Sequence, residues 1–145
     1  MQALQEGNLD KAVDLLARSV MADDNDNDAK ALLGIAYSQK GLHAQAKRAL
    51  ETAIQMAPNN ANYRFNLGVV LARAGDLAGA AAAYRDTLAV NPQHAQARAK
   101  MQELGPQVHQ LLANAPKLNV PPPGSGSAAS SSQAAPAPVA PSAGA

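Results

Sequence analysis

The acidic run DDNDND at residues 23–28 is the part of the sequence whose side chains are spaced as metal ligands could be. Three aspartates alternate in it, as the first three ligands of an EF-hand calcium loop do. That loop needs Gly at its sixth position and Glu at its twelfth, and this chain has Ala29 and Ile35 there. We therefore interpret the run as a turn in which Asp26 or Asn27 caps the following helix, and we expect no metal site.

Catalytic motifs are the second kind of chemistry that the sequence could encode. The histidines, His43, His94 and His109, stand far apart and form no i, i+4 ligand pair. The chain has no cysteine, which excludes thiolate metal sites, disulfides and a cysteine nucleophile. No Walker, GxGxxG or GxSxG motif occurs, and PGSGS at residues 123–127 has no strand before it. We expect no catalytic residue and no cofactor, and hence a protein that is not an enzyme.

Charge and hydropathy argue against two further classes of partner. The 145 residues include 12 basic and 11 acidic ones, and the net charge of +1 gives no field that would attract nucleic acid or a membrane surface. No stretch approaches the roughly 18 to 20 apolar residues of a membrane span, and the N-terminus lacks the pattern of a signal peptide. The default expectation is a cytoplasmic protein. A periplasmic or envelope location stays open if a signal peptide precedes this sequence.

An internal repeat defines the elements that would position any functional residue. Residues 27–60 align with residues 61–94 at a constant shift of 34 residues. Within each unit the apolar residues recur at the helical period, and most are alanine or leucine, which favour helices over strands. A glycine ends the first helix of a unit, and a proline stops the second. The aligned pairs include Gly34 with Gly68, Gly41 with Gly75, and Pro58 with Pro92.

Each unit is therefore predicted to be a pair of antiparallel helices. In the unit at 27–60, the first helix runs from residue 29 to 40 and the second from about 43 to 57. Small residues at Gly34, Ala46 and Ala53 lie where the two helices would cross, and they let the helix axes come close. After residue 94 we expect a further helix, a break at Gly105-Pro106 and a short amphipathic helix that caps the series.

At these residues the chain resembles the tetratricopeptide repeat (TPR) family. Residues 61–94 match a family unit at Leu67, Gly68, Gly75, Ala80, Tyr84 and Pro92. Residues 27–60 match one at Leu33, Gly34, Tyr37, Ala46, Leu50, Ala53 and Pro58. Lys30 and Arg64 replace the large aromatic residue that the family has in its first helix. The resemblance implies an all-α fold, namely an α-solenoid of antiparallel helix pairs that forms a superhelix and binds other proteins.

The repeat register divides the chain into segments. Residues 1–26 would be a partial first repeat, in which the end of a first helix turns at Gly7 into a complete second helix. Two full repeats at 27–60 and 61–94 follow, and residues 95–116 form the C-terminal capping helices. Since half a helix is missing before Gly7, we expect the sequence to be a fragment or an N-terminally truncated array. Its bare apolar side chains would allow an end-to-end homodimer.

Residues 117–145 form the last segment and consist mostly of Pro, Ala, Ser and Gly. Such a composition cannot bury enough apolar surface to offset an ordering entropy of roughly 1 to 2 kcal/mol per residue. We therefore expect a disordered C-terminal tail. It would act as a solubilising tail or a spacer, and the alternative is a Pro-rich ligand for a partner module.

The candidate site is the concave groove lined by the first helix of each unit, where a partner peptide or helix would bind. The resemblance implies that Asn66 projects into this groove, where its amide can both donate to and accept from an extended backbone. Apolar residues at Ile35, Phe65 and Val69 suggest one or two apolar anchors on the ligand. The groove residues are Asp28, Ala31, Leu32, Ile35, Ser38, Gln39, Asn62, Phe65, Asn66, Val69, Arg73 and Lys100.

Three functions remain open from the sequence. The favoured one is a non-catalytic protein–protein interaction module or scaffold, because no motif for catalysis is present. The second is a docking or regulatory region of a larger enzyme, for example a transferase, whose catalytic domain lies outside this sequence. The third is an assembly scaffold of the cell envelope.

Overall fold

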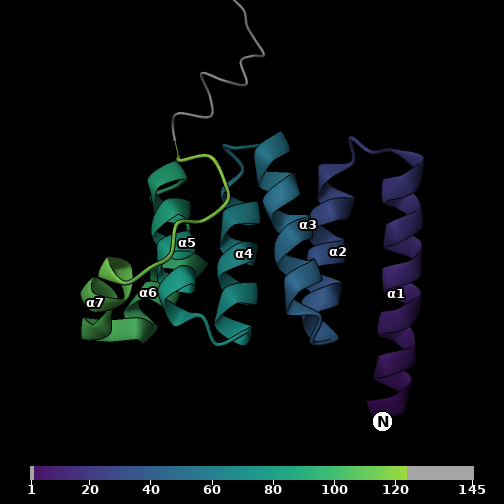
Figure 1. The fold of residues 1–145 in the computed structure, drawn as a ribbon, viewed down its shortest axis with the longest axis horizontal. Coiled ribbons are helices and arrows are strands. Elements are labelled where there is room, and N and C mark those ends of the chain that lie inside the picture. The colour runs from purple at the N-terminus through teal and green to yellow at the C-terminus, as the bar shows by residue number, and fades with distance from the viewer. Residues whose placement is uncertain (1, 124–145) are drawn as a thin grey trace, which may run out of the picture.

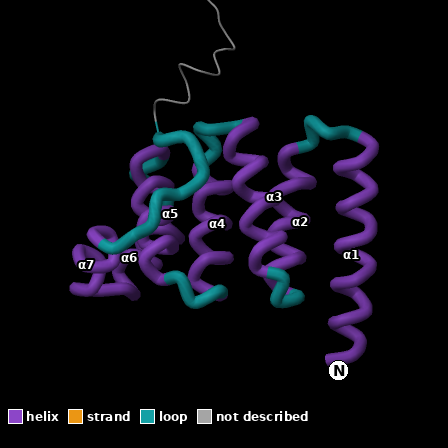
Figure 2. Tube along the Cα trace, viewed as in Figure 1, coloured by secondary structure: helices purple, strands orange, loops and turns teal. Residues whose placement is uncertain are grey.

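The computed structural model describes residues 2–123, and every regular element in that range is helical. The helices stand side by side in chain order, and most contacts join neighbours in the sequence (Figures 1 and 2). This arrangement confirms the predicted all-α solenoid of antiparallel helix pairs. The elements are α1 (Gln2–Ala22), α2 (Asn27–Gln39), α3 (His43–Met56), α4 (Ala61–Arg73), α5 (Leu77–Val90), α6 (Ala95–Leu104), the 3-10 turn η1 (Gly105–Gln107) and α7 (Val108–Ala113).

Side-chain caps fix where most of the central helices begin. Asp26 Oδ1 accepts a hydrogen bond from the backbone N–H of Ala29 at 2.9 Å, which confirms the predicted capping turn before α2. Equivalent caps begin α4, α5 and α6, and each satisfies a backbone donor that the helix itself leaves unpaired. Their capping residues are Asn60, Asp76 and His94.

Glycines set the distance between the two helices of each pair. A Cβ added to Gly34 would lie 2.8 Å from Cγ of Leu50, and one added to Gly68 would lie 2.5 Å from Cε1 of Tyr84. No ordinary side chain fits at such a separation, so α2 packs tightly on α3, and α4 on α5. Ala46 and other fully buried small residues complete these crossings. The predicted close crossing is confirmed.

The turn predicted at Gly7 is wrong. Gly41 and Gly75, after α2 and α4, have φ of 82° and 89°, a left-handed conformation that favours glycine. Gly7 has no such conformation and lies inside α1, which is continuous from Gln2 to Ala22. The few residues before Gly7 are too short to form a separate stable helix, whereas extending α1 costs only about 1 kcal/mol for a glycine in its interior. Helix α1 therefore continues through Gly7 without a turn.

The C-terminal end is capped by α6 and α7, which both pack on α5. The predicted break falls at Gly105, with φ of 60°, in the 3-10 turn that joins the two helices. Of the residues in α6, Ala97 is fully buried, and α7 contributes no fully buried residue. None of the helices between residues 2 and 123 is both long and apolar enough to cross a membrane.

The expectation of disorder from residue 117 onward is wrong for residues 117–123, which we call the C-terminal strap. Leu118 and Val120 pack against the hydrophobic core, and the carbonyl of Asn119 accepts a hydrogen bond from Gln55 Nε2 of α3 at 3.3 Å. The strap crosses α5 in Figure 1. Leu118 and Val120 hold the strap on the core, and its prolines lose little entropy on ordering. Residues 124–145, the remainder of the predicted tail, lie outside the described residues.

Candidate functional site: the groove between α2 and α4

Helices α2 and α4, the first helices of two successive units, contact each other and enclose a cavity of about 200 Å³. Several predicted groove residues meet there, from both helices. Apolar side chains make most of its wall, and Val70, which the prediction did not include, is one of them. The lining residues are Ile35, Ser38, Phe65, Asn66, Val69, Val70 and Arg73.

The three polar side chains that line this cavity, Ser38, Asn66 and Arg73, make no hydrogen bond or ion pair within residues 2–123. Ser38 is only 5% exposed, and its Oγ makes no hydrogen bond. Arg73, the last residue of α4, is exposed and forms no ion pair in the described part of the chain. By contrast, the nearby Lys40 is paired with Asp10 of α1. The groove therefore presents a buried hydroxyl and a free positive charge beside an apolar wall.

A second cavity continues the groove toward α1. It has a volume of about 540 Å³ and is lined by Asn8, Leu9 and Ala12 of α1, by the predicted Gln39, and by Arg73. Arg73 borders both cavities, which therefore lie next to each other.

Phe65 belongs to an aromatic cluster as well as to the groove. Its ring centroid lies 5.7 Å from that of Tyr84 and 5.0 Å from that of His94, both in tilted geometry. His94 Nε2 lies 3.1 Å from Oδ1 of Asn62, which ties the start of α6 to the start of α4. Burial raises the pKa of Tyr84, with a smaller contribution from the Glu103 carboxylate. Phe65 thus holds successive units together, in addition to facing the cavity.

Other predicted groove residues lie elsewhere or have partners within the chain. Ala31 is 3% exposed and belongs to the core, which corrects its assignment to the groove surface, while Leu32 is 52% exposed. Asp28 accepts a hydrogen bond from the hydroxyl of Tyr63 in α4. Burial is the main cause that raises the pKa of Tyr63 to about 12, followed by the bond to Asp28. Lys100 pairs with Glu103 at 3.1 Å on the exposed side of α6.

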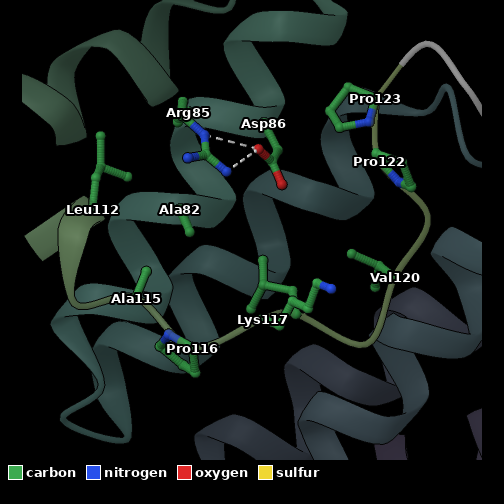
Figure 3. A pocket seen from close by; sticks show the side chains of 11 residues that line it. Ala82, Arg85, Asp86, Leu112, Ala115, Pro116, Lys117, Val120, Pro122 and Pro123 are labelled. Carbon is green, nitrogen blue, oxygen red and sulfur yellow. Dashed lines mark hydrogen bonds and ion pairs between the residues drawn. The ribbon is translucent and has the colours of Figure 1, made fainter.

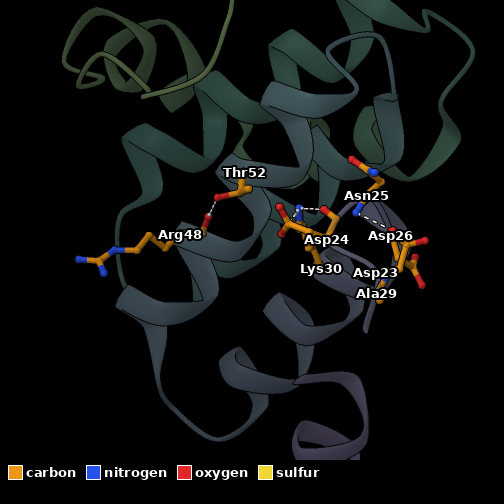
Figure 4. Close-up of polar contacts among 8 residues, drawn as sticks. All are labelled: Asp23, Asp24, Asn25, Asp26, Ala29, Lys30, Arg48 and Thr52. Atoms are coloured by element: carbon orange, nitrogen blue, oxygen red, sulfur yellow. Dashed lines mark hydrogen bonds and ion pairs between the residues drawn. The ribbon is translucent and has the colours of Figure 1, made fainter. Parts of the chain in front are cut away.

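The acidic turn before α2 uses its aspartates for three separate contacts. Asp23 Oδ1 accepts from the backbone N–H of Asn25 at 2.9 Å, and Asp26 caps α2. The carboxylate of Asp24 lies 3.2 Å from Nζ of Lys30, as Figure 4 shows. No cluster of three or more His, Asp or Glu side chains in the described range has the geometry to hold a metal ion.

Comparison with known proteins identifies the repeated units. The family model of the tetratricopeptide repeat matches residues 31–95, the segment that holds the groove. Residues 31–95 are tetratricopeptide repeats. Repeats of this family generally mediate protein–protein interaction, and the repeat is a non-catalytic interaction fold.

Two curated relatives contain a segment similar to this one. They are the cellulose synthase operon protein C of Escherichia coli K12 and the putative cellulose synthase operon protein C of Escherichia coli O157:H7. Each is 39% identical over 62 residues, which is 43% of this chain and 5% of the relative. The similarity therefore covers a small part of these relatives.

Arg64 occupies the position where a tetratricopeptide repeat usually has a large aromatic residue, and it is 1% exposed. Its Nε and Nη2 donate to the carbonyl of Pro58 at 3.1 and 2.9 Å, and Nη2 also donates to the carbonyl of Pro121 in the strap at 2.8 Å. Burial lowers the pKa of Arg64, and the Asp86 carboxylate partly opposes this shift. The sequence signalled a departure from the family at this position, but not a bond to residues so far along the chain.

The strap also borders a third cavity, which the sequence did not predict. This cavity of about 500 Å³ lies between the strap, α5 and α7, as Figure 3 shows. Arg85 and Asp86 of α5 form an ion pair at 2.9 Å on its wall. The other lining residues are Ala82, Leu112, Ala115 and Pro116, and Lys117, Leu118, Val120, Pro122 and Pro123 of the strap.

Proposed function

We propose that the chain is a non-catalytic interaction module that binds an extended segment or a helix of a partner protein in the α2–α4 groove. The observation that supports this function is the cavity whose wall includes Ile35, Val69 and Val70 and which remains unfilled between two repeats. Apolar walls around such a space form a place for a ligand side chain, and peptide grooves in proteins use anchors of this kind.

The groove can be tested with variants of one polar and one apolar residue of its wall, and because Val69 also packs against the core, each variant is checked for its fold. Asn66→Ala and Val69→Lys change half-buried side chains of the cavity wall. Phe65 is a poor choice, since its replacement would also disrupt the contacts to Tyr84 and His94. Matched controls are Gln45→Ala and Arg48→Lys, on exposed positions of α3 away from the cavity. All variants should keep the helical circular dichroism of the parent chain.

The measurement is the set of proteins retained by the immobilised chain and by each variant, compared by quantitative mass spectrometry. We expect proteins retained by the parent and the α3 controls to be lost from both groove variants. Equal retention by all of them would reject the groove as the binding site.

The similarity to cellulose synthase operon protein C favours a second candidate, in which the module belongs to a larger assembly. In this proposal the repeats dock a polysaccharide synthase or another enzyme of the cell envelope, and the module lies in the same compartment as that assembly. Cross-linking of the chain in its native cells, followed by mass spectrometry, tests it. Cross-links to a polysaccharide synthase support this candidate, and their absence when other partners are cross-linked rejects it.

A further inference from the structure

The α2–α4 cavity has the size of one apolar side chain. A cavity of about 150 Å³ in another protein accepts benzene, so about 200 Å³ accommodates a branched aliphatic side chain or a phenyl ring. Ile35, Phe65 and Val69 supply apolar walls from both helices. A ligand that fills this space would therefore contribute one such side chain.

Ser38 adds a polar requirement inside the same cavity. A buried hydroxyl normally finds a hydrogen-bond partner, and a serine in a helix often bonds the carbonyl four residues earlier. Ser38 Oγ has neither within the described residues, although it is buried and lines the cavity. A ligand with a backbone or side-chain polar atom next to its apolar anchor would satisfy this hydroxyl.

Arg73 adds a charge requirement at the edge of the cavity. Lys40, which follows the cavity-lining Gln39, is neutralised by its ion pair with Asp10. Arg73 has no acidic partner between residues 2 and 123, and its guanidinium can donate two hydrogen bonds to a carboxylate. The charge of the groove is thus complementary to an acidic ligand.

We propose that the groove selects a protein segment that carries one apolar side chain close to a carboxylate. The apolar side chain enters the α2–α4 cavity, the carboxylate pairs with Arg73, and a polar atom between them bonds Ser38. This inference rests on the proposed function and specifies the chemistry of the partner. Asn66 bonds the backbone of the same segment, since its amide lines the cavity with both a donor and an acceptor.

The test uses short acetylated and amidated peptides of Gly and Ser with one central anchor, which is Leu, Ile, Val, Met or Phe. Each peptide has a single Asp, and its position before or after the anchor varies from peptide to peptide. Matched peptides have Asn or Lys at the same position. Binding to the full ¹⁵N-labelled chain is followed by NMR, through the backbone amide signals of Asn66, Val69 and Arg73. This readout detects weak binding and also locates it.

At one spacing between Asp and the anchor, we expect the Asp peptides to bind about two- to fivefold more tightly than the matched Asn peptides. This is the range of an exposed ion pair. The Lys peptides should bind least. Arg73→Gln should remove the preference for Asp, so that the Asp and Asn peptides bind this variant equally, while the control Arg48→Gln, with the same loss of charge on α3, should keep the preference. Added salt should weaken the Asp peptides selectively. Ser38→Ala should weaken every peptide that binds.

The outcomes separate this inference from the proposed function. Equal binding of Asp and Asn peptides in the groove, or a preference that survives Arg73→Gln, would overturn the acidic ligand while leaving a peptide groove. Unchanged affinities in Ser38→Ala would overturn the hydroxyl contact. If no peptide of any anchor or charge shifts the groove signals, both the inference and the peptide-binding form of the proposed function fail.

Discussion

Arg64 and Pro58 are joined by two hydrogen bonds to a single carbonyl oxygen, from Nε at 3.1 Å and from Nη2 at 2.9 Å. The guanidinium of Arg64 thereby closes the turn that links α3 to α4. Since the same guanidinium also reaches Pro121, one buried side chain fixes both an inter-repeat turn and the C-terminal strap.

The same contact recurs in the units before and after. Lys30 donates to the carbonyl of Asp24, and Arg98 Nη2 donates to the carbonyl of Pro92 at 2.8 Å, again six residues earlier in the chain. The three basic residues therefore stand at one position of the 34-residue register. In all three units, a cation at this position, where the family usually has an aromatic residue, donates to a carbonyl of the preceding turn.

Replacing Arg64 by Met should destabilise the chain by about 2 kcal/mol, because the buried carbonyl of Pro58 and the partly buried carbonyl of Pro121 lose their donor. The matched variant Arg98→Met removes the same contact at an exposed position and should cost less than about 1 kcal/mol. Urea unfolding followed by circular dichroism measures both. A more stable Arg64→Met would mean that the desolvation of the buried charge outweighs its hydrogen bonds.

Substituting Ala at two glycines should change stability in opposite directions. Gly68→Ala places a Cβ against Tyr84 and should destabilise by about 1–3 kcal/mol. Gly7→Ala meets no atom within 4 Å and lies inside α1, so it should stabilise by up to about 1 kcal/mol. Thermal unfolding gives both values. A loss of stability in Gly7→Ala would show that Gly7 forms a turn instead of helix.

The strap should be released by Val120→Asp, which places a charge against the core. Lys117 at the start of the strap should then become a faster site of tryptic cleavage. The exposed substitution Gln110→Ser in α7 is the control and should leave the cleavage rate unchanged. Mass spectrometry of the fragments over time provides the rates, and equal rates in the two variants would contradict the packing of the strap.

Glu51 on α3 should make stability decrease as the pH rises. Burial raises its pKa above 4.5, and the charges of Lys47 and Arg48 and the backbone of Asn119 only partly oppose this. The folded chain then holds its proton more tightly than the unfolded chain, so the contribution of Glu51 is greatest below pH 4.5 and is lost above it. Glu51→Gln should therefore be more stable than the parent at neutral pH, with a smaller difference at pH 4.5. Thermal melts at both values test this, and a difference that grows on acidification would contradict it.

Self-association through α1 remains a prediction. Leu9, Val13 and Leu16 are half-buried, whereas Leu15 and Met21 are 65% and 85% exposed. Burial of these two side chains between copies would favour a dimer. Light scattering should then show a concentration-dependent mass that Leu15→Lys combined with Met21→Lys reduces to the monomer. A monomeric parent chain at all concentrations would reject the dimer.

The repeat made much of the fold predictable, because register and turn chemistry are local properties. Gly41 and Asp26 signalled their turn and cap directly, and Gly34 signalled the close helix crossing. The groove followed from the same register, which brought Ile35 close to Val69. What the sequence did not predict depends on contacts between distant residues. The strap is one case, since the proline-rich composition around Leu118 predicted disorder, whereas the segment bonds to α3 and α4 and borders α5.

The unpartnered state of Ser38 and Arg73 could not be predicted either. Whether a hydroxyl or a guanidinium has a hydrogen-bond partner depends on the positions of side chains on two helices. The periodicity of the sequence does not predict these positions. Similarly, the basic residue at position 64 was noticed only as a departure from the family. Its partner in the strap lies 57 residues away.

The path of the strap determines where tension on the C-terminal end would enter the molecule. Pulling on residue 123 would load the hydrogen bonds from Arg64 and Gln55 before the load reached α7. These bonds lead to α4 and α3, in the middle of the array. Force applied through a tether fused to this end would therefore act first on α3 and α4, and the terminal helices would not be the first to unfold.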